Sequence, residues 1–242
     1  MAPRFPAHPV FCALDTADAA RARDLAMALT GHVGGFKIGK EFFTARGPEG
    51  VRAAVGAAAL FLDLKFHDIP NTVAGAVRAA CALKPSILNV HAAGGTAMMR
   101  AAAEAATAGA RAAGAVRPWV VAVTVLTSLD DGDLAALGVA SGIEDQVLRL
   151  ASLARDAGLD GAVCSPREVA RLRTELGPDF KLVVPGVRPA GASAGDQKRT
   201  MTPAEALAAG ADVLVVGRPI TEAADPVEAA RAIGAELSRQ AA

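Results

Sequence analysis

Short apolar runs rich in β-branched residues recur along the chain, and each is followed by a longer segment rich in Ala, Leu, Arg and Glu. The runs have the length of buried strands, and the segments between them have the composition of helices. The eight predicted strands are residues 10–14, 35–38, 60–66, 87–90, 119–125, 161–164, 181–184 and 213–216. The predicted helices include residues 18–29, 72–83, 96–108, 143–157, 166–176, 203–209 and 226–237.

Eight strand–helix units in 242 residues predict an α/β protein with a (β/α)8 TIM barrel. A doubly wound open sheet of this length usually has fewer strands. Two predicted helices end alike, with Gly158 and Gly210 placed to terminate them in the left-handed conformation and Asp160 and Asp212 two residues later. Since no linker rich in Pro, Gly and Ser divides the chain, we predict a single domain, residues 1–242. Residues 1–9 are expected to form an extended N-terminal tail.

The third predicted strand carries charges where a buried strand should be apolar. Side chains alternate between the two faces of a strand, so Leu62, Leu64 and Phe66 should pack on helices. Asp63 and Lys65 then point toward the barrel axis. Burying such charges costs several kcal/mol each before pairing returns any of it, and a buried pair of this kind more often marks a catalytic site. An ion pair that only fills the barrel centre is the alternative.

Two further charged residues are predicted beside this pair, Asp15 at the end of the first strand and Lys37 within the second. The chain has six Lys and nineteen Arg, so Lys37 and Lys65 run against its preference for arginine. Lysine can give up a proton when it is desolvated, whereas arginine stays charged in proteins. Proton transfer would explain the choice of lysine. A barrel throat too narrow for guanidinium groups is the steric alternative.

A phosphate site is predicted after the last two strands. Gly217 and Arg218 follow the eighth strand, where many barrels bind phosphate through backbone N–H groups. The glycine lets the backbone approach an anion, and the arginine offers two parallel donors. Arg188 follows the seventh strand. The segment 189–201 after it has the small residues of a mobile lid, with Gln197 placed to bridge a phosphate and a base, and a surface loop without function is the alternative.

Polar residues after the third and fifth strands have two interpretations each. Thr127 and Ser128 suit either a neutral ring at the barrel mouth or the cap of a helix. Asp68 ends the third strand, and Asn71 or Thr72 shortly after it suits the cap of the next helix. His67 is expected to alternate onto the barrel-facing side, as a structural histidine rather than a catalytic one.

Composition excludes several classes of protein. Lys plus Arg and Asp plus Glu both number 25, so no basic excess exists for binding nucleic acid. The longest apolar runs have about ten residues, half of the ~20 that a membrane span needs. No signal-peptide core is evident, and we expect a cytoplasmic protein. The three cysteines, Cys12, Cys81 and Cys164, are expected to be buried, reduced and inert, and no cluster of metal ligands is evident.

The motifs together resemble one family. Residues 63–72 read DLKFHDIPNT, which matches without a gap the signature of bacterial orotidine 5'-phosphate decarboxylases. The likeness extends through ALD (13–15), FKIGKEFF (36–43), VTVLTS (123–128), PGVRP (185–189), GDQKR-x-MTP (195–203) and VVGRPIT (215–221), and leaves out only the first nine residues. The resemblance implies that orotidine 5'-monophosphate (OMP) loses CO2 to give uridine 5'-monophosphate (UMP), the last step of de novo pyrimidine synthesis. It also implies that no metal and no organic cofactor takes part.

The resemblance further implies roles for individual residues. Lys65 would protonate C6 of the pyrimidine, and Lys37, Asp63 and Asp68 would complete an alternating charged network with it. Asp68 and Thr72 would reach into the site of a neighbouring subunit, so that the working unit is a homodimer. Asp63 would face the substrate carboxylate. The other expected contacts are Asp15 and Lys37 with the ribose, Thr127 and Ser128 with the pyrimidine edge, and Arg188, Gln197, Gly217 and Arg218 with the phosphate.

Two other functions remain open at this point. The first is a sugar-phosphate lyase or decarboxylase similar to 3-keto-L-gulonate 6-phosphate decarboxylase or hexulose-phosphate synthase. Those families carry a related Asp-x-Lys-x-x-Asp strand but use Mg²⁺ to hold an enediolate. The second is a catalytically silent nucleotide-binding protein on the same scaffold, which the intact Lys65 and its two carboxylates argue against.

Overall fold

The computed structural model describes residues 8–189 and 201–240, without the side chain of Gln240. Most of the predicted N-terminal tail and of the predicted lid lies outside these residues. Gln197 is among the residues left out. The predictions for the tail, the lid and Gln197 are therefore not tested.

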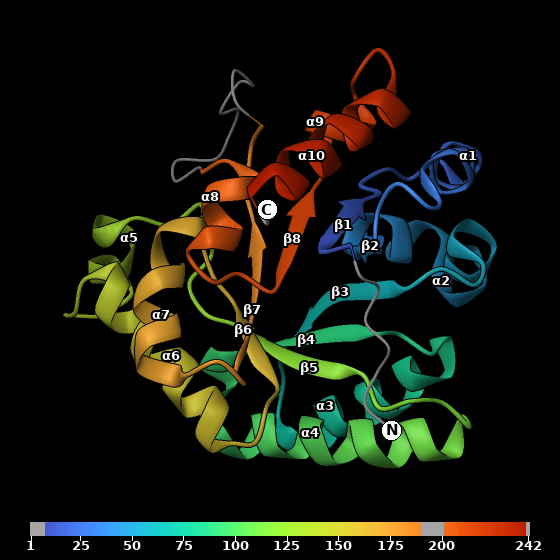
Figure 1. Cartoon of the computed structure of the whole chain (residues 1–242). Coiled ribbons are helices and arrows are strands. Elements are labelled where there is room, and N and C mark those ends of the chain that lie inside the picture. The colour runs from blue at the N-terminus through green and yellow to red at the C-terminus, as the bar shows by residue number, and fades with distance from the viewer. Residues whose placement is uncertain (1–7, 190–200, 241–242) are drawn as a thin grey trace.

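The described chain forms a closed barrel of eight parallel strands in sequence order, as predicted (Figure 1). Pairing of β1 with β8, with Val10 opposite Leu214, closes the barrel. The strands are β1 (Val10–Ala13), β2 (Gly35–Gly39), β3 (Leu60–Phe66), β4 (Ile87–His91), β5 (Trp119–Val123), β6 (Gly161–Val163), β7 (Lys181–Pro185) and β8 (Val213–Val216). Each lies within two residues of its predicted bounds, because the apolar runs correspond to the buried strands.

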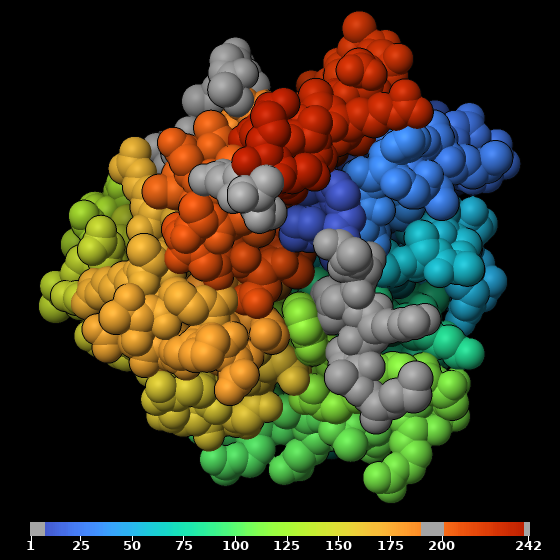
Figure 2. Space-filling view, in the orientation of Figure 1, coloured from blue at the N-terminus to red at the C-terminus, as the bar shows by residue number. Residues whose placement is uncertain are grey.

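Helices connect successive strands and form the outer layer of the barrel. The α-helices are α1 (Ala19–Leu29), α2 (Lys40–Val55), α3 (Pro70–Ala80), α4 (Gly95–Ala112), α5 (Asp131–Ala136), α6 (Ile143–Asp156), α7 (Val169–Leu176), α8 (Pro203–Ala208), α9 (Arg218–Thr221) and α10 (Pro226–Gln240). Short 3₁₀ turns are η1 (Cys81–Leu83), η2 (Ala92–Gly94) and η3 (Pro166–Glu168). Figure 2 shows the colours running in sequence order around the rim, so units that follow one another in the chain are neighbours in space.

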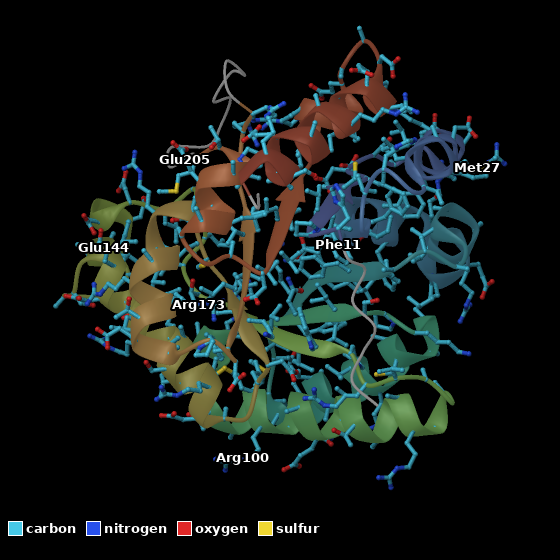
Figure 3. The ribbon with its side chains drawn as sticks, viewed as in Figure 1. Phe11, Met27, Arg100, Glu144, Arg173 and Glu205 are labelled. Atoms are coloured by element: carbon cyan, nitrogen blue, oxygen red, sulfur yellow. The ribbon has the colours of Figure 1, made fainter. Side chains whose placement is uncertain are left out.

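Two hydrophobic layers follow from the alternation of side chains along the strands. In β1, Val10 and Cys12 belong to the large core between strands and helices, whereas Phe11 belongs to a smaller cluster inside the barrel. Figure 3 places Phe11 near the centre of the ring and Met27 on its outer side. The inner cluster fills the barrel below the carboxyl ends of the strands. The ends themselves are thereby left for polar side chains.

The two predicted corners between helix and strand are equivalent, as the sequence indicated. Gly158 has φ 84° and Gly210 has φ 108°, the left-handed conformation that ends a helix. The Asp160 carboxylate accepts a hydrogen bond from the Val120 N–H at 2.7 Å, and the Asp212 carboxylate accepts one from the Leu182 N–H at 2.8 Å. Each carboxylate therefore stabilises the amino end of the preceding strand in the barrel, β5 for Asp160 and β7 for Asp212.

Replacing Asp212 by alanine is expected to lower the free energy of unfolding by about 3 kcal/mol. The Arg173 Nη2 donates to Asp212 Oδ2 at 2.6 Å, and both side chains are mostly buried, so the arginine would lose its carboxylate partner. Urea unfolding measures the change. The matched control is Asp24→Ala, which removes an exposed ion pair with Arg23 and should cost less than about 1 kcal/mol. Equal effects of the two variants would contradict the prediction.

Other sequence predictions concern the thiols and the membrane. The three cysteines are free and buried, and burial raises the pKa of the Cys12 thiol to about 12. A thiol with a raised pKa stays protonated and is a poor nucleophile. Over the described part of the chain, no helix combines the length and apolarity that crossing a membrane requires.

Candidate active site

Four charged side chains, those of Asp15 after β1, Lys37 on β2, and Asp63 and Lys65 on β3, form a continuous series of ion pairs at the carboxyl end of the barrel. We call these four residues the charge array. Lys37 Nζ lies 2.8 Å from Asp15 Oδ1 and 3.3 Å from Asp63 Oδ2, and Lys65 Nζ lies 2.6 Å from Asp63 Oδ1. The side chains of Lys37 and Asp63 are 10% and 11% exposed, whereas that of Asp15 is 58% exposed. The sequence prediction that Asp15 and Lys37 lie beside Asp63 and Lys65 is therefore confirmed.

Mutual attraction keeps the two central residues of the charge array, Lys37 and Asp63, ionised. Burial by itself would lower the pKa of the Lys37 ammonium, but the carboxylates of Asp63 and Asp15 raise it above its usual value. Burial would likewise raise the pKa of Asp63, but Lys37, Lys65 and a hydrogen bond from Asn89 bring it below its usual value. The site therefore holds fixed charges in a poorly solvated place, where they act strongly on a bound molecule.

Small residues leave space around these charges. A Cβ atom on Gly39 would lie 3.3 Å from both Asp15 Oδ1 and Lys37 Nζ. Such a contact is tighter than ordinary van der Waals distance, so any larger residue at position 39 would press on this ion pair. The absence of a side chain at Gly39 therefore leaves the space that the ion pair between Asp15 and Lys37 occupies.

Lys65 has φ 52°, the left-handed conformation that residues other than glycine seldom adopt. This conformation costs of the order of 1 kcal/mol or more and clusters at functional sites. The two-residue alternation nevertheless continues to the end of β3, because Leu62, Leu64 and Phe66 pack on the outer core while Asp63 and Lys65 line the cavity. The prediction for His67 is wrong in one respect, because His67 is exposed, does not line the cavity, and packs instead against the His91 ring at 5.4 Å between centroids.

A cavity of about 540 Å³ opens directly above the charge array. Asp15, Lys37, Asp63 and Lys65 line it together with predicted residues from the opposite side of the barrel, namely Thr127, Arg188, Gly217 and Arg218. A volume of this size suits a small-molecule ligand. The structure thus brings most of the predicted site residues into one pocket.

The two arginines lie close enough to affect one another. Burial and the positive charge of Arg218 lower the pKa of Arg188. Among the described residues, Arg188 has no carboxylate within ion-pair distance, and its Nη1 donates to the Val187 carbonyl at 3.0 Å. Two neighbouring guanidinium groups repel each other, and an anion that binds between them relieves this repulsion. Their placement therefore favours an anionic group on the ligand.

Of the predicted site residues that the structure describes, three lie outside the cavity lining. Ser128, Asp68 and Thr72 are exposed, and the Asp68 carboxylate accepts a hydrogen bond from the Ile69 N–H at 2.6 Å. The alternative that Asn71 or Thr72 caps α3 is wrong, because Ile69 is the N-cap and makes no side-chain capping bond. The alternative that Thr127 or Ser128 caps α5 is also wrong, because Asp130 holds that position.

Sequence reasoning overlooked a buried polar residue, Asn89, in the middle of β4. It is 1% exposed, and its side chain contacts both Asp63 and Lys65. The signal was present, since Asn89 interrupts an apolar run just as Asp63 interrupts β3. Lys40 and Cys164 also line the cavity and were not predicted to do so.

His91 at the end of β4 is held neutral. Burial, followed by the positive charges of His67, Lys40 and Lys65, lowers the pKa of His91 to about 4, although Asp63 acts in the opposite direction. In an unfolded chain the pKa of the same residue lies near its usual value of 6.5. Between these two values the unfolded state binds more protons than the folded state.

This difference predicts that folding stability falls as the pH is lowered from about 6.5 to about 4. The contribution of His91 is fully present above the upper value and is lost toward the lower one. The shift corresponds to at most roughly 3 kcal/mol, and the loss is smaller than this because solvent screens the half-buried ring. Urea unfolding of the wild type and of His91→Gln across this range measures it. The variant should show a shallower dependence on pH. The same slope in both proteins would contradict the neutral state of His91.

No group of three or more His, Cys, Asp or Glu side chains within residues 8–189 and 201–240 is arranged to hold a metal ion. The carboxylates of the array are engaged by lysines instead. Asp15 and Asp63 each have an ammonium as their nearest charged partner.

A ligand-sized cavity lined by ionised groups at the carboxyl ends of the strands places this chain among the TIM-barrel enzymes that act on small anionic substrates. Comparison with known proteins narrows this class. The family model described as "Orotidine 5'-phosphate decarboxylase / HUMPS family" matches residues 8–233. The chain belongs to this family, as its motifs indicated.

Individual relatives agree with the family match. The chain is 60% identical to orotidine 5'-phosphate decarboxylase of Rhodospirillum rubrum, over 95% of this chain and 94% of the relative. It is 58% identical to the protein of the same name from Paramagnetospirillum magneticum, over 95% of this chain and 98% of the relative. The crystal structure of orotidine 5'-phosphate decarboxylase from Lactobacillus acidophilus superposes with a TM-score of 0.85 at 38% identity, covering 95% and 99% of the two chains.

Proposed function

We propose that this chain decarboxylates OMP to UMP and CO2, the last step of de novo pyrimidine synthesis. The observation that carries the proposal is the charge array in which Lys65 lies 2.6 Å from Asp63 and Asp63 lies 3.3 Å from Lys37, deep in the cavity. The names of the relatives, whose sequences match over nearly the whole chain, support it.

The reaction needs a charge near one carbon atom. When the bond between C6 and the carboxyl group breaks, its electron pair stays on C6 in the plane of the ring, where it cannot delocalise into the ring carbonyls. An ammonium close to C6 stabilises this pair through its field and then transfers a proton from Nζ to C6. We assign this role to Lys65. Solvent must return a proton to its amine before the next turnover.

Asp63 would contribute by repelling the substrate carboxylate. Two like charges about 4 Å apart at an effective dielectric constant of about 20 repel by ~4 kcal/mol. This corresponds to about three decades of rate, whereas strong enzymatic accelerations reach about 17 decades. Repulsion in the ground state is therefore a minor contribution. Stabilisation by Lys65 and phosphate binding energy used for closure of the lid would supply more.

The remaining lining residues suit the rest of the substrate. Arg188, Arg218 and the backbone of Gly217 line the same end of the cavity, and together they would bind the phosphate group. Asp15 and Lys37 stand between this end and Lys65, where ribose hydroxyls would lie. Thr127 would face the pyrimidine. For Ser128, which is exposed, and for Gln197, which is outside the described residues, the predicted contacts rest on the resemblance alone.

We further propose that the working unit is a homodimer in which Asp68 and Thr72 complete the site of the partner. Both residues are exposed, and Ile69 between them has 67% of its surface exposed, an apolar side chain suited to an interface. Asp68 comes three residues after Lys65 yet does not line the cavity of its own chain. The cytoplasmic location remains a prediction from the sequence.

The decisive experiment is to treat the purified protein with EDTA, mix it with OMP, and follow the loss of the orotate chromophore. Turnover that survives EDTA is expected, because the array engages its carboxylates with lysines. Activity that disappears with EDTA and returns with Mg²⁺ would favour the sugar-phosphate alternative. Binding of UMP by calorimetry without turnover of OMP would favour the silent nucleotide-binding protein.

A further inference from the structure

The pairing between β3 and β4 is irregular next to the charge array. Leu62 pairs with Leu88 and Phe66 pairs with Val90. Three residues of β3, 63–65, therefore lie opposite a single residue of β4, which is Asn89. A bulge of this kind removes regular ladder partners from the longer segment and redirects its side chains. Here the longer segment carries the two charged residues at the centre of the array.

Asn89 replaces the missing ladder bonds with its side chain. Its Oδ1 accepts a hydrogen bond from the Lys65 backbone N–H at 2.7 Å, and its Nδ2 donates to Asp63 Oδ1 at 2.7 Å. The same Asp63 oxygen accepts the hydrogen bond from Lys65 Nζ at 2.6 Å. One buried amide thus binds the backbone of the lysine and the carboxylate that orients its ammonium.

We propose that Asn89 is the positioning residue that sets the geometry of Lys65 relative to Asp63. This inference rests on the proposed function of the site. The left-handed backbone of Lys65 is unfavourable by itself, so it needs a partner that holds the N–H in that orientation. An amide is suited to the place because it offers one acceptor and one donor without adding a charge. Neither a leucine side chain nor an ionised carboxylate has both.

The role predicts a loss of turnover rather than of substrate affinity. A displacement of about 1 Å in a reacting group costs up to about a hundredfold in rate. Asn89→Ala is expected to lower kcat about a hundredfold while KM changes less than about threefold. The number of folded sites is counted by UMP binding in a calorimeter, so that kcat refers to folded protein.

Asn89→Asp provides the rescue test. At high pH it places a second carboxylate next to Asp63, and the two like charges raise the apparent pKa of the pair. When the pair takes up a proton, the neutral carboxyl group introduced at position 89 can donate to Asp63 and accept from the Lys65 N–H, as the amide does. The kcat of this variant relative to wild type should therefore rise as the pH falls, and at low pH it should exceed that of Asn89→Ala.

The matched control is Thr124→Val, at the residue that follows β5. Thr124 is also a buried polar residue near the barrel mouth, but its hydroxyl donates to the Val163 carbonyl at 2.9 Å and does not touch the charge array. Its kcat should stay at the wild-type value.

Two results would overturn the inference: a wild-type kcat per folded site in Asn89→Ala, or no recovery of kcat in Asn89→Asp at low pH. If Asn89→Ala does not fold, the pH dependence of the isosteric Asn89→Asp variant decides alone. Wild-type protein that fails to turn over OMP would instead contradict the proposed function.

Discussion

Replacing Lys65 by alanine is expected to lower kcat for OMP by at least about 10⁴-fold. The variant loses both the proton donor for C6 and the field that stabilises the developing charge, and each contributes about 10²-fold or more in other enzymes. It also leaves the Asp63 carboxylate with less compensation near the substrate carboxylate. Chromophore loss with a large excess of enzyme measures the residual rate, and UMP binding shows that the variant is folded.

The comparison variants are Arg188→Ala and Arg218→Ala at the phosphate end of the cavity. Both variants should lose affinity for OMP and also some kcat, because phosphate binding energy is used for closure of the site. Their loss of kcat should be smaller than that of Lys65→Ala, since the phosphate does not change in the chemical step. The ranking is the informative result. If either arginine variant loses as much kcat as Lys65→Ala, binding of the phosphate rather than the lysine would carry the rate acceleration.

The strands were predictable because burial on both faces demands apolar runs, and these runs stand out in an Ala-rich chain. The prediction of the helices was less complete, because it did not include α2, α5 and α9. α2 contains Gly47 at φ 62° followed by Pro48, which on sequence grounds ends a helix, and the structure has two helical segments joined at that kink. α9, residues Arg218–Thr221, is too short to show a helical period.

The site was predictable to the extent that its residues violate the apolar pattern. Asp63 and Lys65 were found because alternation assigns them to the barrel interior, and Asn89 would have been found by the same rule applied to β4. The bulge was not predictable, because nothing in the sequence marks Lys65 as left-handed. The alternation held through Phe66, the last residue of β3, and failed only at His67 beyond the strand.

Mixing two inactive variants is expected to restore activity if Asp68 serves the partner's site. Lys65→Ala and Asp68→Ala homodimers each lack one group in both sites. In a mixed dimer, the chain with Asp68→Ala keeps its own Lys65 and receives Asp68 from its partner, so one site is complete. Equal coexpression should therefore give about one quarter of the wild-type kcat per chain, since half of the dimers are mixed and each has one complete site of two.

The control is the same mixture made with Asp63→Ala in place of Asp68→Ala. Asp63 and Lys65 lie 2.6 Å apart within one chain, so no combination of these two variants rebuilds a site. If activity recovers in the mixture of Lys65→Ala with Asp68→Ala but not in the mixture of Lys65→Ala with Asp63→Ala, the Asp68 carboxylate crosses the interface. If both mixtures stay inactive while the variants still dimerise, Asp68 acts within its own chain. Its exposed position after β3 would then have to change when substrate binds, because Asp68 does not line the cavity in this structure.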